Sequence, residues 1–251
     1  MNLHIYYRHY NTTAGNVKRR PEWFSYHRCL ANLFQTLLQT ENSKIFFTLV
    51  FDGSESDYQS DFSSKLVESW VGINQNLLIR RVLIDAGSDK SSGLKTLLMA
   101  VNNQLILDDD LIYFLENDYL HLDGWINAVR TLFDSQIPWH YVSLYDHSDK
   151  YNFHPHFNKK YINLKSFLYV TKFNHWRSAP STCGSFIVRA KILREDQFFV
   201  ARFKDRRLLP ILKILKNRIL LSALPGLSTH CMDGLLSPTI DWRKIAERNS
   251  F

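Results

Sequence analysis

Short apolar runs alternate with amphipathic stretches along the first two-thirds of the chain. Four apolar runs have the length of buried strands, and they cover residues 3–7, 44–51, 77–84 and 111–115. Three stretches with apolar residues at helical spacing lie between them, at residues 21–39, 58–70 and 91–105. Strands that alternate with helices pair in parallel through right-handed crossovers. The pattern therefore predicts an α/β fold, Rossmann-like, with a mixed, mostly parallel sheet and helices on both faces.

The regular alternation of predicted strands and helices ends after Trp125. We expect a helix over residues 125–134 and further strands over residues 141–145, 166–171 and 185–189. Residues 146–160 are polar, aromatic and rich in histidine, which indicates a functional loop. No Pro/Gly/Ser-rich linker interrupts the chain, so residues 1–251 are predicted to form a single domain.

Composition and cysteine usage narrow the class of protein. The chain has 251 residues, of which 45% are hydrophobic and 22% charged, values typical of a globular protein rather than a disordered one. Three widely spaced cysteines without a CxxC pair indicate reduced thiols in the cytoplasm. The N-terminus lacks the charge and apolar pattern of a signal peptide, and no apolar run is long enough to span a bilayer. We therefore expect a cytoplasmic protein.

The positive net charge is concentrated in one segment. Lys and Arg number 31 against 24 Asp and Glu, and residues 202–218 alone contain seven Lys or Arg and one Asp. Nucleic-acid binding, which needs a broad basic face, is therefore not expected. Residues 202–221 combine Leu and Ile with these basic residues, which predicts a peripheral contact with an anionic membrane surface. The alternative is a helix packed on the sheet with a solvated basic face.

The acidic triplet after the apolar run at 111–115 is the main candidate for chemistry. Glu116 and Asp118 are two residues apart, so in extended backbone both side chains point to the same side. Carboxylates of this kind bind Mg²⁺ or Mn²⁺ together with phosphate oxygens. Such a metal would stabilise a departing diphosphate. The alternative is a solvated acidic turn at the end of a strand.

Several segments together resemble the GT-A glycosyltransferases, in particular family 2-like bacterial sugar transferases. The similar segments are residues 45–54 (IFFTLVFDGS), 92–95 (SGLK), 111–125 (LIYFLENDYLHLDGW) and 184–189 (GSFIVR). They follow the order of that family across residues 3–190. The resemblance implies a nucleotide-sugar-binding half over about residues 1–125 and an acceptor-side half over about residues 126–251.

The resemblance also implies roles for individual residues. A divalent metal, Mn²⁺ or Mg²⁺, would be held by Glu116, Asp118 and the late His230. The implied donor is a nucleotide-diphospho-sugar, with substrate contacts from Arg8, Asp52, Gly53, Gly93, Lys95, Asn117 and Trp176. The acceptor would be a glycan or a lipid-linked glycan of bacterial surface polysaccharide such as lipopolysaccharide, and the resemblance favours inversion. The general base would come from Asp196 or Asp146, with Glu195 and Asp233 as further candidates.

Other readings of these residues remain open from the sequence. A metal-dependent nucleotidyltransferase would use the same acidic strand end. A non-catalytic protein could bind anionic membrane through residues 202–218. His147, His154 and His156 are candidates for a zinc site, although their spacing fits a loop that covers the sugar better. The signatures of phosphate-binding loops, dinucleotide-binding folds and α/β-hydrolases are missing from the sequence.

Overall fold

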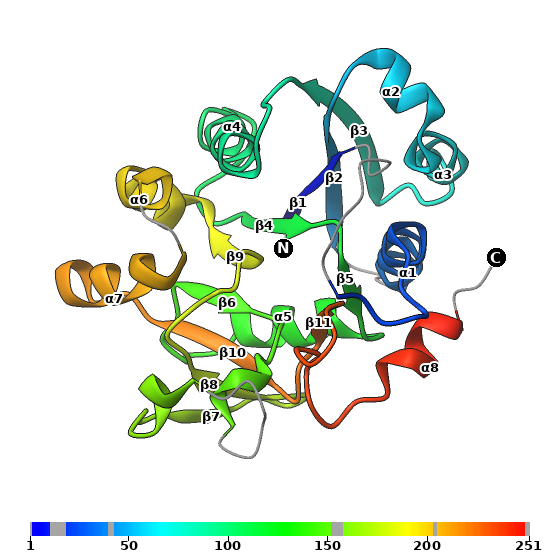
Figure 1. Cartoon of the computed structure of the whole chain (residues 1–251). Helices are drawn as coiled ribbons and strands as arrows, with labels where there is room; N and C mark the ends of the chain where they lie inside the picture. The colour runs from blue at the N-terminus through cyan, green and yellow to red at the C-terminus, as the bar shows by residue number, and fades with distance from the viewer. Residues whose placement is uncertain (1, 11–18, 40–42, 152–157, 203–204, 249–251) are drawn as a thin grey trace.

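A large mixed sheet forms the centre of the molecule (Figure 1). The computed structural model describes residues 2–10, 19–39, 43–151, 158–202 and 205–248. The nine-stranded sheet has the order β3-β2-β1-β4-β9-β6-β10-β8-β7, and all its strands except β9 and β8 run in one direction. Both sequence halves contribute strands to it. The strands are β1 (Asn2–Tyr10), β2 (Lys44–Asp52), β3 (Leu77–Ile84), β4 (Leu111–Glu116), β6 (Tyr141–Ser143), β7 (Leu168–Val170), β8 (His175–Ser178), β9 (Phe186–Arg189) and β10 (Leu220–Leu224).

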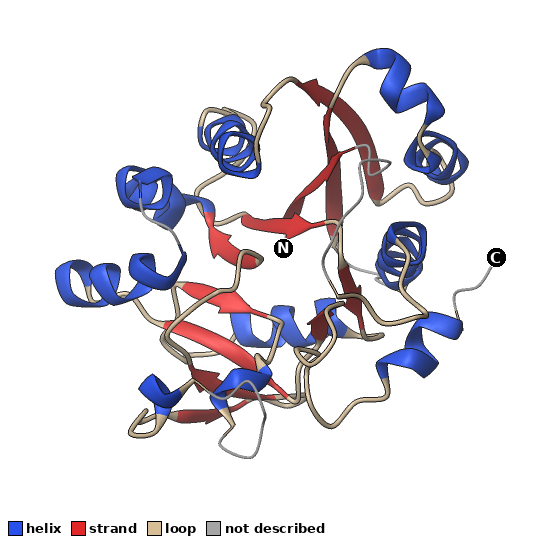
Figure 2. Ribbon diagram, in the orientation of Figure 1, coloured by secondary structure: helices blue, strands red, loops and turns tan. Residues whose placement is uncertain are grey.

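Helices cover both faces of this sheet, and a short two-stranded ribbon lies beside it (Figure 2). The ribbon pairs β5 (Tyr119–His121) with β11 (Ser228–His230). The helices are α1 (Tyr26–Leu38), α2 (Glu55–Ser60), α3 (Phe62–Trp70), α4 (Asp89–Val101), α5 (Trp125–Phe133), α6 (Ala190–Arg202), α7 (Asp205–Lys216) and α8 (Trp242–Glu247), with short 3₁₀ turns at Ser148–Lys150 and Lys159–Tyr161. The predicted α/β class, mostly parallel with helices on both faces, is confirmed.

Alternating side chains of the central strands supply two separate cores. In β1, Leu3, Ile5 and Tyr7 pack with α1, α3 and α5. Tyr6, between them, faces the opposite core, to which α4, α6 and α7 contribute. Since both faces of β1 are covered, its residues read as a continuous apolar run. This arrangement leaves the carboxyl ends of the parallel strands as the polar edge of the sheet.

The C-terminal half departs most from the predicted elements. Residues 207–221 do not form one helix, because α7 ends at Lys216 and Leu220 begins β10. Asn217 adopts a left-handed conformation with φ 52, and the amide of Arg218 donates to the carbonyl of Leu212, which closes the end of α7. Strand β8 was also not predicted.

In the N-terminal half, the predicted helix at 58–70 is divided at Asp61, because α2 ends at Ser60 and α3 begins at Phe62.

The predicted membrane-facing helix is largely a core element. Leu208, Leu209 and Leu212 of α7 are buried in the core shared with α4 and α6. The alternative expected from the sequence, a packed helix, therefore accounts for these three leucines, whereas Ile214 and Leu215 of the same helix are exposed. Among the helices of the described ranges, none combines the length and the apolar character needed to cross a bilayer.

Candidate functional site

A cavity of about 700 Å³ opens at the carboxyl ends of β1, β2 and β4. Ligands of open α/β sheets bind at this edge, since the loops that follow the parallel strands converge there. The start of α4 closes one side of the cavity. The lining residues are Arg8, His9, Tyr10, Arg20, Tyr26, Asp52, Gly53, Asp85, Gly87, Ser88, Asp89, Ser92, Glu116, Asn117 and Asp118.

Strand register places an arginine beside the first acid of the triplet. Arg8 of β1 and Glu116 of β4 are direct partners across the parallel pair. The Arg8 guanidinium donates to Glu116 Oε1 at 2.7 Å and to Asp89 Oδ1, at the start of α4, at 2.9 Å. Arg8 therefore links β4 to the first turn of α4 across the floor of the cavity.

The second acid of the triplet lies in a separate cluster with Arg20 and His230. Asp118 Oδ2 accepts a hydrogen bond from Arg20 at 2.6 Å and lies 3.0 Å from His230 Nε2. The β5–β11 ribbon fixes this geometry, because it pairs His230 with Tyr119 and the amide of Cys231 donates to the carbonyl of Asp118 at 2.9 Å. The His230 ring also stacks on Tyr119, with a centroid distance of 5.2 Å. Asp118 and His230 are thus brought together from distant parts of the chain.

The two acids of the triplet have opposite electrostatic environments. Burial and the neighbouring Asp118 charge raise the pKa of Glu116 despite the opposing effect of Arg8. Burial acts on Asp118 in the same direction, but the hydrogen bond and charge of His230, together with Arg20, hold the pKa of Asp118 well below its ordinary value. Asp118 is therefore the firmly ionised carboxylate of the pair.

The Asp118–His230 pair has part of the chemistry that a divalent metal needs. Within the described residues, Asp118 Oδ1 is buried without a hydrogen-bond partner. No group of three or more His, Cys, Asp or Glu side chains in that part of the chain is already arranged around a metal-sized position. Oxygen ligands with one imidazole suit Mn²⁺, and phosphate oxygens commonly complete such a site. The donor set therefore fits a metal that shares its coordination with a bound phosphate.

The cavity carries more negative than positive side chains. Its lining contains the two arginines already described and five carboxylates, at Asp52, Asp85, Asp89, Glu116 and Asp118. A diphosphate that entered this cavity alone would meet net repulsion. A divalent cation would offset most of that excess negative charge, and as the largest local charge it would attract the diphosphate to its own position.

Asn117 is held at the base of the cavity by His9, which is itself paired with Asp61. Its amide nitrogen lies 2.8 Å from His9 Nδ1, and His9 Nε2 lies 3.0 Å from Asp61 Oδ1. Burial opposes ionisation of Asp61, but the hydrogen bonds from His9 and Ser63 together outweigh the effect of burial, and the pKa of Asp61 is lowered. These contacts fix the backbone turn between Glu116 and Asp118.

The remaining predicted donor-side residues also lie at or beside the cavity. Asp52 lines it and accepts a hydrogen bond from the amide of Ala86 at 2.8 Å, and Gly53 follows directly. Gly93 on α4 lies against the Arg8 guanidinium, where an added Cβ would be 3.5 Å from Nη1. The exposed Lys95 donates to the carbonyl of Asp85.

Three predicted residues lie elsewhere. Trp176 is fully buried in the core, where its indole nitrogen donates to Thr171, so it cannot stack on a sugar ring. Asp196 on α6 is fully buried and bound to Arg218 at 2.9 Å and Lys216 at 3.0 Å. These ion pairs stabilise the junction of α6 with α7 and leave Asp196 no access to an acceptor.

Asp146 is likewise engaged by its neighbours. Its carboxylate accepts hydrogen bonds from Arg177 at 2.6 Å and from the Tyr151 hydroxyl, and it does not line the cavity. Of the further base candidates, Glu195 pairs with Arg218, and Asp233 is an exposed loop residue. None of these acids is placed at the Glu116–Asp118 edge.

The predicted histidine cluster is described only in part. His147 Nδ1 lies 2.7 Å from Asp149 Oδ1, and the His147 ring packs against Tyr145. His154 and His156 lie outside the described residues. The zinc reading therefore stays a prediction.

The charged and aromatic cavity residues that the sequence analysis missed include Arg20, Tyr26, Asp85 and Asp89. Arg20 lies in an irregular segment before α1, where no periodic pattern indicates its orientation. Asp85 and Asp89 could have been found, because they follow the apolar run at residues 77–84 and so belong to the same strand-end edge.

Comparisons with known proteins bear on the fold. No family model matches this sequence, and no curated protein is significantly similar to it. Apo UDP-glucose pyrophosphorylase is similar in structure with a TM-score of 0.52, over 99% of this chain and 98% of that chain, at 7% identity. Two solved structures give TM-scores of 0.45. One is the galactosyltransferase LgtC with donor and acceptor sugar analogues, at 14% identity over 87% of this chain and 72% of that chain. The other is the cytidylyltransferase IspD of Francisella tularensis, at 11% identity over the whole of both chains.

At these identities, structural similarity is informative about the fold alone. The TM-score with the pyrophosphorylase supports a shared α/β architecture along nearly the full length of both chains. The two lower scores add no argument.

Proposed function

We propose that this protein is a glycosyltransferase that uses a nucleotide-diphospho-sugar donor and a divalent metal. The observation that carries the proposal is the pair of Asp118, which lines the strand-end cavity, and His230, which contacts Asp118 but is not itself a lining residue. The donor nucleotide would lie over the ends of β1 and β2, beside Asp52 and Gly53. Its diphosphate would face Arg8, Arg20 and the metal position.

Each side chain then has a defined task. Asp118 and His230 would hold the metal, and Glu116, which pairs with Arg8, would join them only by giving up part of that contact. When bound, the metal would stabilise the negative charge of the departing diphosphate. Arg8 and Arg20 would each give up part of their contact with a carboxylate and donate to phosphate oxygens instead. Charge-assisted hydrogen bonds to phosphate favour this exchange.

The acceptor side of the proposed site lies beyond Glu116. Gly184, just before β9, has φ +88, and an added Cβ would be 3.0 Å from Glu116 Oε2. The missing side chain leaves room for the Glu116 carboxylate at the boundary between the two sequence halves. An acceptor hydroxyl from a glycan or a lipid-linked glycan would approach the sugar from this side. Inversion at the anomeric carbon remains our expectation from the family resemblance.

Cavity charge favours glycosyl transfer over nucleotidyl transfer. A nucleoside triphosphate carries more negative charge than a nucleotide-diphospho-sugar. The cavity has two arginines against five carboxylates, so a single divalent cation can balance the charge of a diphosphate better than that of a triphosphate. Nucleotidyl transfer is the second candidate, because its substrates would use the same strand-end edge.

Calorimetric titration tests the donor site directly. UDP, GDP, CDP and dTDP would each be titrated with and without Mn²⁺. We expect one nucleotide to bind in the presence of Mn²⁺ and its affinity to fall at least about tenfold in Asp118→Asn, which removes a charge-assisted ligand. Asp196→Asn is the matched control, since it alters a buried, doubly paired carboxylate outside the cavity. No binding of any nucleotide at millimolar concentrations would overturn the proposal.

Product analysis separates the two enzyme classes. Incubation with the matching nucleotide sugar should release the free nucleoside diphosphate as the sugar passes to an added glycan acceptor or, more slowly, to water. Incubation of the nucleoside triphosphate with a sugar phosphate should release no pyrophosphate. Pyrophosphate release that depends on Asp118 would assign the protein to nucleotidyl transfer instead.

A further inference from the structure

Residues 158–173, around the edge strand β7, expose several large apolar side chains on both sides of that strand, and we call this region the β7 face. The exposed fractions are 72% for Ile162, 70% for Phe167, 58% for Leu168, 62% for Val170 and 60% for Phe173. Strand β7 is the last in the sheet order, so its outer backbone edge faces away from β8. Clusters of large apolar side chains on a surface usually mark an interaction site.

The β7 face also carries four lysines, and Asp134, at the end of α5, is an acidic residue beside it, around the cavity lined by Val170 and Lys172. Lys159, Lys160, Lys165 and Lys172 are all exposed on it. The sequence contains no Asp or Glu between Asp149 and Glu195, so acidic residues of this segment do not neutralise these lysines. The Lys172 ammonium lies 5.2 Å from the centroid of the Phe173 ring, which places a cation directly beside an exposed aromatic side chain.

The outer side of α7 extends this surface. A cavity of about 350 Å³ separates residues 164–169 from α7, and its lining includes Leu164, Phe167 and Lys213. Ile214, next along α7, is 81% exposed. The buried leucines of α7 hold the helix on the core, so only its outer side can contact a partner.

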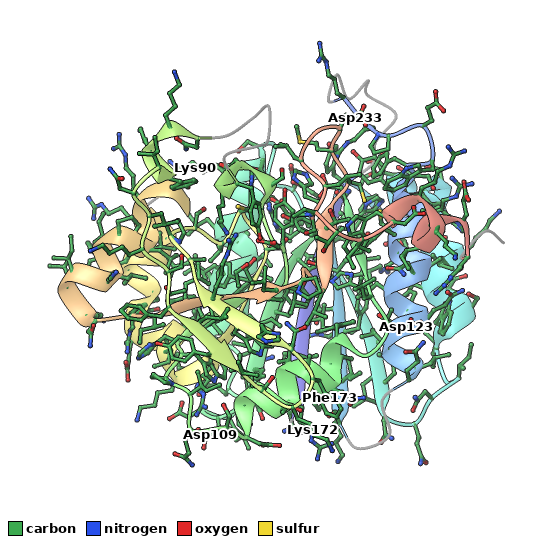
Figure 3. All side chains as sticks on the ribbon, turned by 90° about the horizontal axis from the view of Figure 1, so that it is seen from below. Lys90, Asp109, Asp123, Lys172, Phe173 and Asp233 are labelled. Atoms are coloured by element: carbon green, nitrogen blue, oxygen red, sulfur yellow. The ribbon has the colours of Figure 1, made fainter. Side chains whose placement is uncertain are left out.

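The β7 face and the proposed donor site lie in different parts of the molecule. Figure 3 places Lys172 and Phe173, at the turn between β7 and β8, at the opposite end from Asp233 and Lys90. Lys90 follows Asp89, which lines the cavity. A partner bound at the turn would therefore leave the cavity open to solvent.

We propose that the β7 face docks onto an anionic lipid bilayer. Phe167, Phe173 and the neighbouring aliphatic side chains would enter the headgroup–acyl boundary, and the lysines would contact anionic headgroups. Interfacial binding of this kind combines buried apolar area with attraction to anionic lipid. The proposal does not depend on the donor site, because the residues that carry it are remote from the cavity.

Charge distinguishes a bilayer from the other occupants of such a face. A second copy of this chain would bring the same lysines against the same edge strand, so like charges would meet. A nucleic acid would satisfy the lysines but leave Ile162, Leu168 and Val170 in contact with water. An anionic bilayer offers both an apolar interior and a negative surface.

Vesicle sedimentation of the full chain tests the proposal. The probes are phosphatidylcholine vesicles and phosphatidylcholine vesicles containing about one-third phosphatidylserine. We expect binding to the anionic vesicles that weakens with added salt, and little binding to phosphatidylcholine alone. Lys160→Gln with Lys172→Gln should lower the partition coefficient about 30-fold, because each lysine near an anionic surface contributes about a fivefold factor. Phe167→Ser with Phe173→Ser should abolish binding.

Two control variants match these changes on other exposed surfaces. Lys44→Gln with Lys65→Gln removes two exposed lysines, and Leu105→Ser with Leu107→Ser removes two exposed apolar side chains. Both controls should bind anionic vesicles as the unchanged chain does. Thermal melts would check that every variant is folded. If the double phenylalanine variant is unfolded, the single variant Phe173→Ser takes its place.

Three results would overturn the proposal. The first is no binding of the unchanged chain to anionic vesicles at low salt. The second is equal binding by the test variants and their controls. The third is a concentration-dependent dimer that Phe167→Ser with Phe173→Ser dissociates, since the face would then join two copies. Nucleotide titration of the same variants should be unchanged, which separates this proposal from that of the donor site.

Discussion

His121 on β5 is a fully buried histidine that the fold holds in its neutral form. Its Nε2 lies 2.9 Å from the Tyr113 hydroxyl, and its ring packs against Tyr113 and Trp125. Its Nδ1 has no hydrogen-bond partner within the described residues. Burial lowers the pKa of His121 from 6.5 to about 3. Protonation of this ring would place an uncompensated charge among aromatic side chains.

The lowered pKa makes the free energy of unfolding depend on pH in a defined direction. Between about pH 3 and pH 6.5, the unfolded chain binds a proton at His121 that the folded chain does not bind. Stability contributed by the neutral ring is therefore present above pH 6.5 and is lost as the pH falls. Between about pH 8 and pH 5, the loss from His121 alone amounts to about 2 kcal/mol.

Denaturant unfolding of the unchanged chain and of His121→Gln tests this reasoning. Glutamine keeps a hydrogen-bonding group near Tyr113 but does not titrate, so its free energy of unfolding should fall about 2 kcal/mol less between pH 8 and pH 5. The difference between the two proteins is the relevant quantity, because burial also lowers the pKa of His4 and His140. An equal loss of stability in both proteins would refute the assignment of a buried neutral ring to His121.

Three substitutions probe the site and its surroundings. Gly184→Ala places a Cβ against Glu116 at a positive φ, so we expect a loss of about 1–2 kcal/mol in stability and weaker nucleoside diphosphate binding, measured by melts and calorimetry. Trp176→Ala should cost about 3–5 kcal/mol and leave nucleotide affinity unchanged, whereas a selective loss of affinity would restore a substrate role. Asp196→Asn should cost about 1–3 kcal/mol by weakening the contacts to Arg218 and Lys216, and an unchanged melting temperature would contradict the structural role.

Much of the fold of residues 1–125 could be predicted because its strands are long and apolar. Parallel order brings the ends of the apolar runs to one edge, and this placed Arg8, Asp52 and Glu116 around the same cavity. The prediction needed no side-chain detail, only strand direction. Asp118 and Asn117 followed from their position directly after β4.

Residues 126–251 gave weaker signals for physical reasons. Leu220 and Leu221 continue the apolar pattern of α7, so β10 is hidden unless the left-handed conformation of Asn217 is known. Asp196 is neutralised by Lys216 and Arg218, which come 20 or more residues later, and a sequence pattern does not indicate such pairing. An isolated tryptophan such as Trp176 is equally compatible with a core position and with a sugar contact.

The closure of the β5–β11 ribbon has a consequence for the order of folding. Asp118 and His230 are separated by 112 residues, and their contact requires β11 to pair with β5. Contacts between residues so far apart in the sequence form late, because the long loop between them must close before the contact can stabilise the chain. During synthesis, the strands β1 to β4 can assemble well before His230 leaves the ribosome. A nascent chain would therefore contain the floor of the cavity but not the Asp118–His230 pair until nearly the whole described chain has been made.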